Sequence, residues 1–269
     1  MDIVTHEIPK FAEAYGFSTA KTGGHMARSM MLPEITQLFR ALPPETTKDR
    51  YKIAIVDDNV LGKPTFASRE KSYRHLIQLY SLEPTLALFR ILRKLASDEP
   101  ASLPLMAATC AFCRDAQLRA SFSMIEKRDR GEVLTREQME EHLEKSFPGR
   151  FSPAMKKSLA QNVNTTWTES GHLSGRSKKI RAVPEARVAA SVYAMTLGYL
   201  LGLRGQSLLS SVFSRLVAPD PSFVASHLAM ATGRGWVRFR QAGGVVEIDC
   251  SPLLTEAERA EQKQMELYG

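Results

Sequence analysis

Apolar residues recur at three- and four-residue spacing in this chain, most clearly at Met31, Ile35, Leu38 and Leu42. This spacing buries one face of an α-helix, and the proline pair at 43 and 44 ends the segment. Further segments of helical character follow, so we expect a mostly α-helical protein. The expected helices cover about 25–41, 48–56, 65–80, 83–96, 103–127, 136–146, 153–168, 184–203 and 222–232.

Capping residues and turns divide the chain. Thr65 or Ser68 can cap the helix that follows them, and Thr135 with Gln138 forms a capping box for the helix over 136–146. We expect two helical subdomains with a boundary between about 130 and 150. Residues 1–130 form the first and contain a helix-turn-helix, and residues 131–269 form the second. The acidic segment 254–269 is a candidate helix, expected to be solvated.

Two of the expected helices form a helix-turn-helix over about residues 52–80. The second of them carries basic residues among apolar ones, as expected when one face packs and the other meets phosphates. The alternative is a solvated helix face, with the hydroxyl residues acting only as caps. The residues predicted to contact DNA here are Lys63, Thr65, Ser68, Arg69, Lys71 and Arg74.

Two short runs around Gly243-Gly244 indicate a β-hairpin over about residues 236–249. Arg238 and Arg240 alternate in the first strand and so share one face, which leaves Val237 and Phe239 to pack on the other. A helix followed by a hairpin is how a winged helix ends. We therefore predict that Arg238 and Arg240 contact a minor groove from a C-terminal β-wing.

The basic residues are concentrated along the chain. Lys and Arg number 36 against 29 Asp and Glu, a net charge of +7, and segment 145–187 alone holds nine basic and two acidic residues. Such concentration favours a polyanionic partner. Within the polar stretch 170–184, four basic residues have no neighbouring carboxylate, so we predict that they contact backbone phosphates. They are Arg176, Lys178, Lys179 and Arg181.

The three cysteines, Cys110, Cys113 and Cys250, are too few for a disulfide framework, which indicates a reducing compartment. No apolar run reaches about 18 residues and no secretory leader is recognisable, so we expect a cytoplasmic protein without a membrane partner. One Cys-x-x-Cys pair offers too few ligands for a closed zinc site. We expect both of its thiols to be small buried apolar groups and predict no metal or other cofactor.

Few features of the sequence indicate an enzyme. Asp57, Asp58, Glu70 and Lys71 could belong to a metal-dependent nuclease, but the strand context is missing and turn formation explains the two aspartates. The phosphate-binding loop, the dinucleotide fingerprint, the zinc-hydrolase motif and the serine-hydrolase elbow are all absent. We therefore predict a non-catalytic protein.

Several short segments carry a family resemblance. They are Thr22-Gly23-Gly24, residues 58–69, the apolar helices ending in Arg114-Asp115, residues 162–167, and Ser170-Gly171 with the basic run after it. In this order and spacing, from Phe17 to about Leu254, the chain resembles the BrxA family of bacterial BREX phage-defence systems. The resemblance implies a small helical DNA-binding component, distinct from the methyltransferase, ATPase and phosphatase-like members, with other BREX proteins as partners.

From these observations we expect sequence-tolerant binding of double-stranded DNA within a defence complex. A protein-interaction adaptor with no DNA binding of its own is the main alternative. RNA binding is a third possibility, although few exposed aromatic residues are expected for stacking on single strands. A metal-dependent nuclease is the enzyme alternative.

Overall fold

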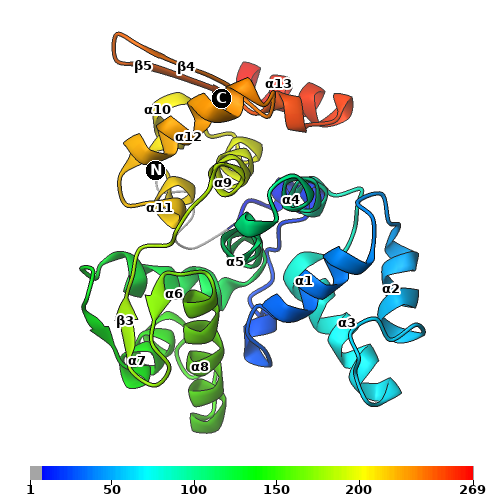
Figure 1. Ribbon diagram of the computed structural model, residues 1–269. Helices are drawn as coiled ribbons and strands as arrows, with labels where there is room; N and C mark the ends of the chain where they lie inside the picture. The colour runs from blue at the N-terminus through cyan, green and yellow to red at the C-terminus, as the bar shows by residue number, and fades with distance from the viewer. Residues whose placement is uncertain (1–7, 269) are drawn as a thin grey trace.

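The computed structural model describes residues 8–268, and of residues 266–268 it describes the backbone only. Within this range the chain is mostly α-helical, with a two-stranded hairpin near its C-terminal end, which confirms the predicted fold class (Figure 1). The α-helices are α1 (Leu32–Ala41), α2 (Lys48–Val56), α3 (Phe66–Tyr80), α4 (Ala87–Asp98), α5 (Leu103–Arg114), α6 (Ala116–Glu126), α7 (Arg136–Ser146), α8 (Pro153–Glu169), α9 (Val188–Leu200), α10 (Gly205–Leu209), α11 (Val212–Val217), α12 (Pro221–Gly233) and α13 (Glu256–Tyr268). The 3₁₀ helices are η1 (Lys10–Tyr15), η2 (Gly24–Met26), η3 (Pro100–Ser102) and η4 (Ser251–Leu253).

Five short strands form two antiparallel sheets among the described residues. β1 (Val133–Leu134), β2 (Leu173–Ser174) and β3 (Lys179–Arg181) form the first, in the order β1-β3-β2. β4 (Arg238–Ala242) and β5 (Val245–Asp249) form the second, with Arg238 opposite Asp249 and Ala242 opposite Val245. The second sheet is the hairpin that the sequence predicts. The first is not predicted, because its strands have only two or three residues each.

Four predicted helices differ from the observed ones, and those expected over 83–96 and 184–203 begin only at Ala87 and Val188. The helix expected over 25–41 begins only at Leu32, because Met31 adopts a left-handed backbone conformation (φ 52°) and a short 3₁₀ turn precedes it. The helix expected over 103–127 is two helices. Asp115 lies between them in an extended conformation, and its carboxylate accepts hydrogen bonds from the backbone N–H groups of Gln117 and Leu118 at the start of α6.

The apolar core is one continuous cluster from Ile8 to Leu254, so helices from both predicted subdomains contribute to it. α9 lies at its centre, because all of its residues are buried and it packs against α4, α5, α11 and α12. This burial explains why α9 is almost entirely apolar. No helix within residues 8–268 combines the length and the apolar character needed to cross a membrane.

The acidic C-terminal helix α13 is docked, contrary to the expectation of a solvated end. Glu258 accepts hydrogen bonds from Arg90 of α4, and Glu261 accepts one from the hydroxyl of Tyr15, 2.8 Å away. The side chain of Gln262 is buried and donates to the carbonyl oxygen of Leu200. Helix α13 therefore joins the two ends of the described chain; Gly269 lies outside the described residues.

Candidate nucleic-acid interface

Residues 116–181 form a winged helix-turn-helix. The order along the chain is α6, β1, α7, α8, β2 and β3, and the strand order β1-β3-β2 places the last strand between the other two. α7 packs against both α6 and α8, and β2 continues from α8 (Figure 1). In this topology α8 takes the position of the recognition helix and the β2–β3 turn that of the wing. The sequence did not predict this winged helix in the middle of the chain, whereas the predicted order of a helix followed by a hairpin is present at the C-terminal end as α12, β4 and β5.

Local sequence signals begin and end each of these helices. Thr135 and Gln138 cap α7 reciprocally, which confirms the predicted capping box. Gly149, in a left-handed conformation (φ 66°), lies in the turn after α7. Ser152 then caps α8 by accepting a hydrogen bond from the N–H of Met155. The short turn between the two capped helices sets the angle at which α8 leaves the body.

An aromatic cluster holds the recognition helix in place. The ring of Trp167 lies 5.5 Å from that of Phe122 on α6 and 4.9 Å from that of His172, which precedes β2. The indole N–H of Trp167 donates to the hydroxyl of Ser121, 2.8 Å away. All four side chains are buried, so α6, α8 and the start of β2 are packed against one another in one cluster.

The wing tip carries two exposed cations. Gly175 turns the chain with φ 87°, and the side chains of Arg176 and Lys178 beyond it are exposed. Neither has an ion-pair or hydrogen-bond partner among the residues with described side chains. The prediction that these two residues lack local partners is thus confirmed, and both are available to an anionic ligand.

The other two residues of this basic run are committed to the fold. Arg181 is 6% exposed, and its guanidinium donates to the carbonyl oxygens of His172 and Ala182. Its burial lowers the pKa of the guanidinium. Lys179 is half-buried and its Nζ donates to the carbonyl oxygen of Gly175, 2.9 Å away. The prediction that all four basic residues contact backbone phosphates is therefore wrong for Arg181, which is buried, and Lys179 is also engaged within the fold, because β3 turns both side chains toward the body.

A second group of cations lies beside the recognition helix. Lys71 and Arg74 of α3 are exposed, as is Arg28, which follows η2. Burial lowers the pKa of the His75 imidazole, and the positive charges of Arg28, Lys71 and Arg74 add to this effect, which places all three near His75. Because η2 packs against both α3 and α8, Arg28, two residues beyond it, lies close to both helices. Arg28 was not predicted, because it lies in no motif that indicates a ligand contact.

The remaining predicted contacts of the first helix-turn-helix hold the protein together instead. Lys63 forms an ion pair with Glu34, with Nζ and Oε1 2.8 Å apart. Thr65 and Ser68 cap α3 as a capping box, which confirms their predicted structural role. Arg69 donates to the carbonyl oxygen of Val56 at the end of α2. Of the six residues predicted here, only Lys71 and Arg74 are exposed without a described partner.

The C-terminal hairpin offers weaker candidates. Arg238 is paired with Asp249, with Nη1 and Oδ2 2.8 Å apart, and Arg240 stands opposite Glu247 in the ladder. Both arginines are exposed, while Val237 is buried and Phe239 packs against the core, as predicted. Each cation thus has a carboxylate on the opposite strand, which reduces its attraction for phosphate.

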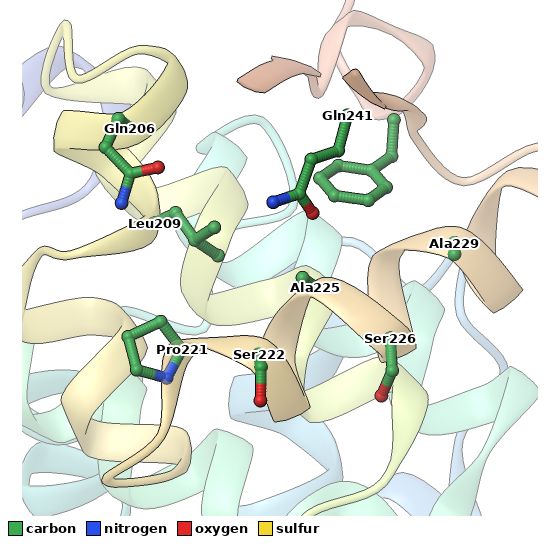
Figure 2. A pocket seen from close by; sticks show the side chains of 9 residues that line it. Gln206, Leu209, Pro221, Ser222, Ala225, Ser226, Ala229 and Gln241 are labelled. Atoms are coloured by element: carbon green, nitrogen blue, oxygen red, sulfur yellow. The ribbon is translucent and has the colours of Figure 1, made fainter. Parts of the chain in front are cut away.

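A groove lies between the hairpin and α12. It has a volume of about 410 Å³, and Figure 2 shows Ala225 of α12 on the side of the helix toward Gln241, with Ser226 and Ala229 further along the same helix. No charged residue lines it. Phe223 and Met230 of the same helix are exposed, at 41% and 57%. This face is apolar and neutral, unlike the surface around α8.

No group of three or more His, Cys, Asp or Glu side chains within the described residues could hold a metal ion. Cys110 and Cys113 are free and buried, and burial raises the pKa of the Cys110 thiol to about 12. The thiols therefore pack as apolar groups, as predicted.

Comparison with known proteins gives no relative: no protein-family model matches the chain, and no curated protein matches it.

Proposed function

We propose that this protein binds double-stranded DNA through the winged helix of residues 116–181. The observation that carries the proposal is the combination of winged-helix topology with an exposed, unpaired basic wing tip at Arg176 and Lys178. In this arrangement α8 enters the major groove, while the wing and the cations of Arg28, Lys71 and Arg74 contact phosphates on either side. The proposed role is binding without catalysis.

The ion pairs of the winged helix support a phosphate-binding role for the wing. Two carboxylates of residues 116–181 pair with cations, Glu144 with Lys156 and Glu126 with Arg215, while burial raises the pKa of Glu169 at the end of α8. The wing cations have no such partner within the described chain. Unpaired cations on a rigid scaffold release counterions when they meet phosphates, and this release drives association at low salt.

The test is a titration of the whole protein on a labelled DNA duplex at two salt concentrations. Replacing Arg176 and Lys178 by Ala should weaken binding about tenfold and reduce the slope of log affinity against log salt by about 2, one for each lost phosphate contact. The matched control removes two other exposed cations, Arg40 and Lys52, which lie on α1 and α2. Equal affinities for both double variants would contradict the assignment to the wing.

We further propose that this DNA binding serves a BREX-type phage-defence system, in which other BREX proteins are the partners. The resemblance of the segments described above to BrxA supports this placement. Deleting the gene from a host with such a system and measuring phage plating tests it. Unchanged protection after deletion would remove the defence role and leave the DNA-binding proposal as it stands.

A protein-interaction adaptor is the second candidate function. The neutral groove beside α12 and the exposed Phe223 and Met230 favour it, because apolar exposed patches mark interaction surfaces. If the wild-type protein fails to retard DNA at low salt, the adaptor becomes the better proposal.

A further inference from the structure

The solvent-facing side of α8 carries small and polar residues at helical spacing. One stripe at helical spacing holds the exposed residues Ala154, Lys157, Ser158, Gln161 and Thr165. Pro153 and Met155, in the first turn of the helix, are exposed beside it. The opposite side carries Leu159, Val163 and Trp167, all fully buried. Spacing of three and four residues aligns the exposed set along one line, so all its members can meet the floor of one groove.

Two polar side chains of this stripe are uncommitted. Neither the Ser158 hydroxyl nor the Gln161 amide forms a hydrogen bond with any residue between 8 and 265. The polar residues on the packed side differ, since the Asn162 amide donates to the carbonyl oxygen of His25 and Asn164 is buried. The amide of Gln161 therefore keeps both its donor and its acceptor for a ligand.

The stripe carries little charge. Lys157 is its one cation, while the unpaired cations of the surface lie beside it on the wing and near α3. This separates phosphate contacts at the flanks from neutral, hydrogen-bonding groups in the centre. Phosphate contacts position a protein on the duplex, and hydrogen bonds to base edges select the sequence.

The helix that carries the stripe is rigidly held. Lys156 pairs with Glu144 on α7, and the hydroxyl of Thr166 lies 2.7 Å from Nε2 of His25. A side chain on such a helix has a defined position relative to the groove. Gln161 can then meet one base pair in a fixed register rather than several in turn.

We propose that Gln161, assisted by Ser158, reads base edges in the major groove, with adenine as the base recognised by Gln161. In the major groove, the amide oxygen of a glutamine accepts a hydrogen bond from N6 of adenine, and its amide nitrogen donates one to N7. This inference rests on the proposed function and changes the expected binding from sequence-tolerant to sequence-selective. The wing and the flanking cations supply affinity, and the stripe supplies sequence selectivity.

The test is selection of bound molecules from a pool of duplexes with a randomised centre, followed by sequencing. The wild-type protein should enrich a shared motif that contains adenine. Replacing Gln161 by Ala should reduce discrimination at one position about tenfold and leave affinity for unselected DNA unchanged. Gln161→Arg should shift that position to guanine, because arginine matches O6 and N7 of guanine. Gln264→Ala on α13, also exposed, is the matched control.

The outcomes separate the two proposals. If the wild-type protein retains DNA but enriches no motif, or if the motif is the same after Gln161→Ala and Gln161→Arg, base reading by Gln161 is overturned and DNA binding stands. If the wild-type protein retains no DNA at low salt, both proposals fail. Because Gln161 is exposed and makes no side-chain contact by hydrogen bonding, its variants should unfold at the wild-type temperature.

Discussion

Nε2 of His25 lies 2.7 Å from the hydroxyl oxygen of Thr166, on the packed side of the recognition helix. Nδ1 of the same ring lies 2.9 Å from a carboxylate oxygen of Asp115, at the junction of α5 and α6. In the neutral tautomer with its proton on Nδ1, the imidazole donates to Asp115 and accepts from Thr166. All three side chains are buried, so this chain of contacts fixes α8 to the body.

Replacing Thr166 by Val should lower the free energy of unfolding by about 3 kcal/mol, because it leaves His25 Nε2 and the backbone N–H of Met30 without a partner in the interior. Urea denaturation measures the change. Thr165→Val, at the exposed neighbouring position, is the control and should change stability by less than about 0.5 kcal/mol. Similar losses at both positions would mean that the contact with His25 contributes nothing.

The pH dependence of stability should report on His172. Burial, with the positive charge of Arg181 adding to it, lowers the pKa of this imidazole to about 3. In the unfolded chain its pKa is about 6.5. As the pH falls from about 6.5, the unfolded chain binds a proton that the folded protein does not. The free energy of unfolding therefore decreases, by about 1.4 kcal/mol per pH unit, until the pH approaches 3.

His172→Gln removes this titration and keeps a donor that can reach the carbonyl oxygen of Leu216. Urea denaturation of both proteins between pH 7 and pH 4.5 isolates the effect, because the other titrating groups are common to both. Stability of the wild-type protein should fall more steeply. Parallel curves would show that His172 has an ordinary pKa in the folded state.

Much of the helical framework could be predicted because its signals are local. The spacing of apolar residues, the capping threonines at 65 and 135, and the Gly243-Gly244 turn act within a few residues, and the structure bears each of them out. The break at Asp115 has a local signal that the prediction missed, because aspartate is a favoured N-cap residue and its Oδ1 accepts from the N–H groups of Gln117 and Leu118. Its Oδ2 contacts His25, which is 90 residues away in the chain, and no local pattern indicates this second contact.

The winged helix of residues 116–181 could not be predicted for a similar reason. Its sheet joins β1 at residues 133–134 to strands more than 35 residues later, and strands of two or three residues carry no periodic pattern. Composition did identify the wing as a basic segment. It could not separate Arg176, which is exposed, from Arg181, which the strand turns inward. Whether each basic side chain is exposed or buried depends on its place in the sheet and not on its charge.

Arg181 and Arg176 should therefore respond oppositely to the same substitution. Arg181→Met should lower the free energy of unfolding by about 2 kcal/mol, because it leaves the carbonyl oxygen of Ala182 without its donor and removes one of the two donors to the carbonyl oxygen of His172. The salt dependence of DNA binding by the Arg181→Met variant should equal that of the wild-type protein. Arg176→Met should leave stability unchanged and reduce the salt slope by about 1. Denaturation and duplex titration of both variants test this, and a reduced slope for Arg181→Met would contradict the structural role.

The shape of the wing can be tested without changing its charge. Gly175 has φ 87°, and a Cβ atom there would lie 2.2 Å from the carbonyl oxygen of Lys178, so Gly175→Ala must displace the wing backbone. Gly202, after α9, has the same φ of 87° with nothing within 4 Å of such an atom, which makes Gly202→Ala a matched control for backbone strain. Each variant should lose about 1–2 kcal/mol of stability from the left-handed conformation.

Only Gly175→Ala should weaken binding to a DNA duplex, by about tenfold, since displacing Arg176 and Lys178 removes up to two phosphate contacts while the net charge stays the same. The measurement is a titration at fixed salt under conditions where both variants are fully folded, as checked by circular dichroism. If both variants bind the duplex as tightly as the wild-type protein, the charge of the wing, and not its conformation, determines binding. A loss in both would point instead to a general effect of strain on the fold.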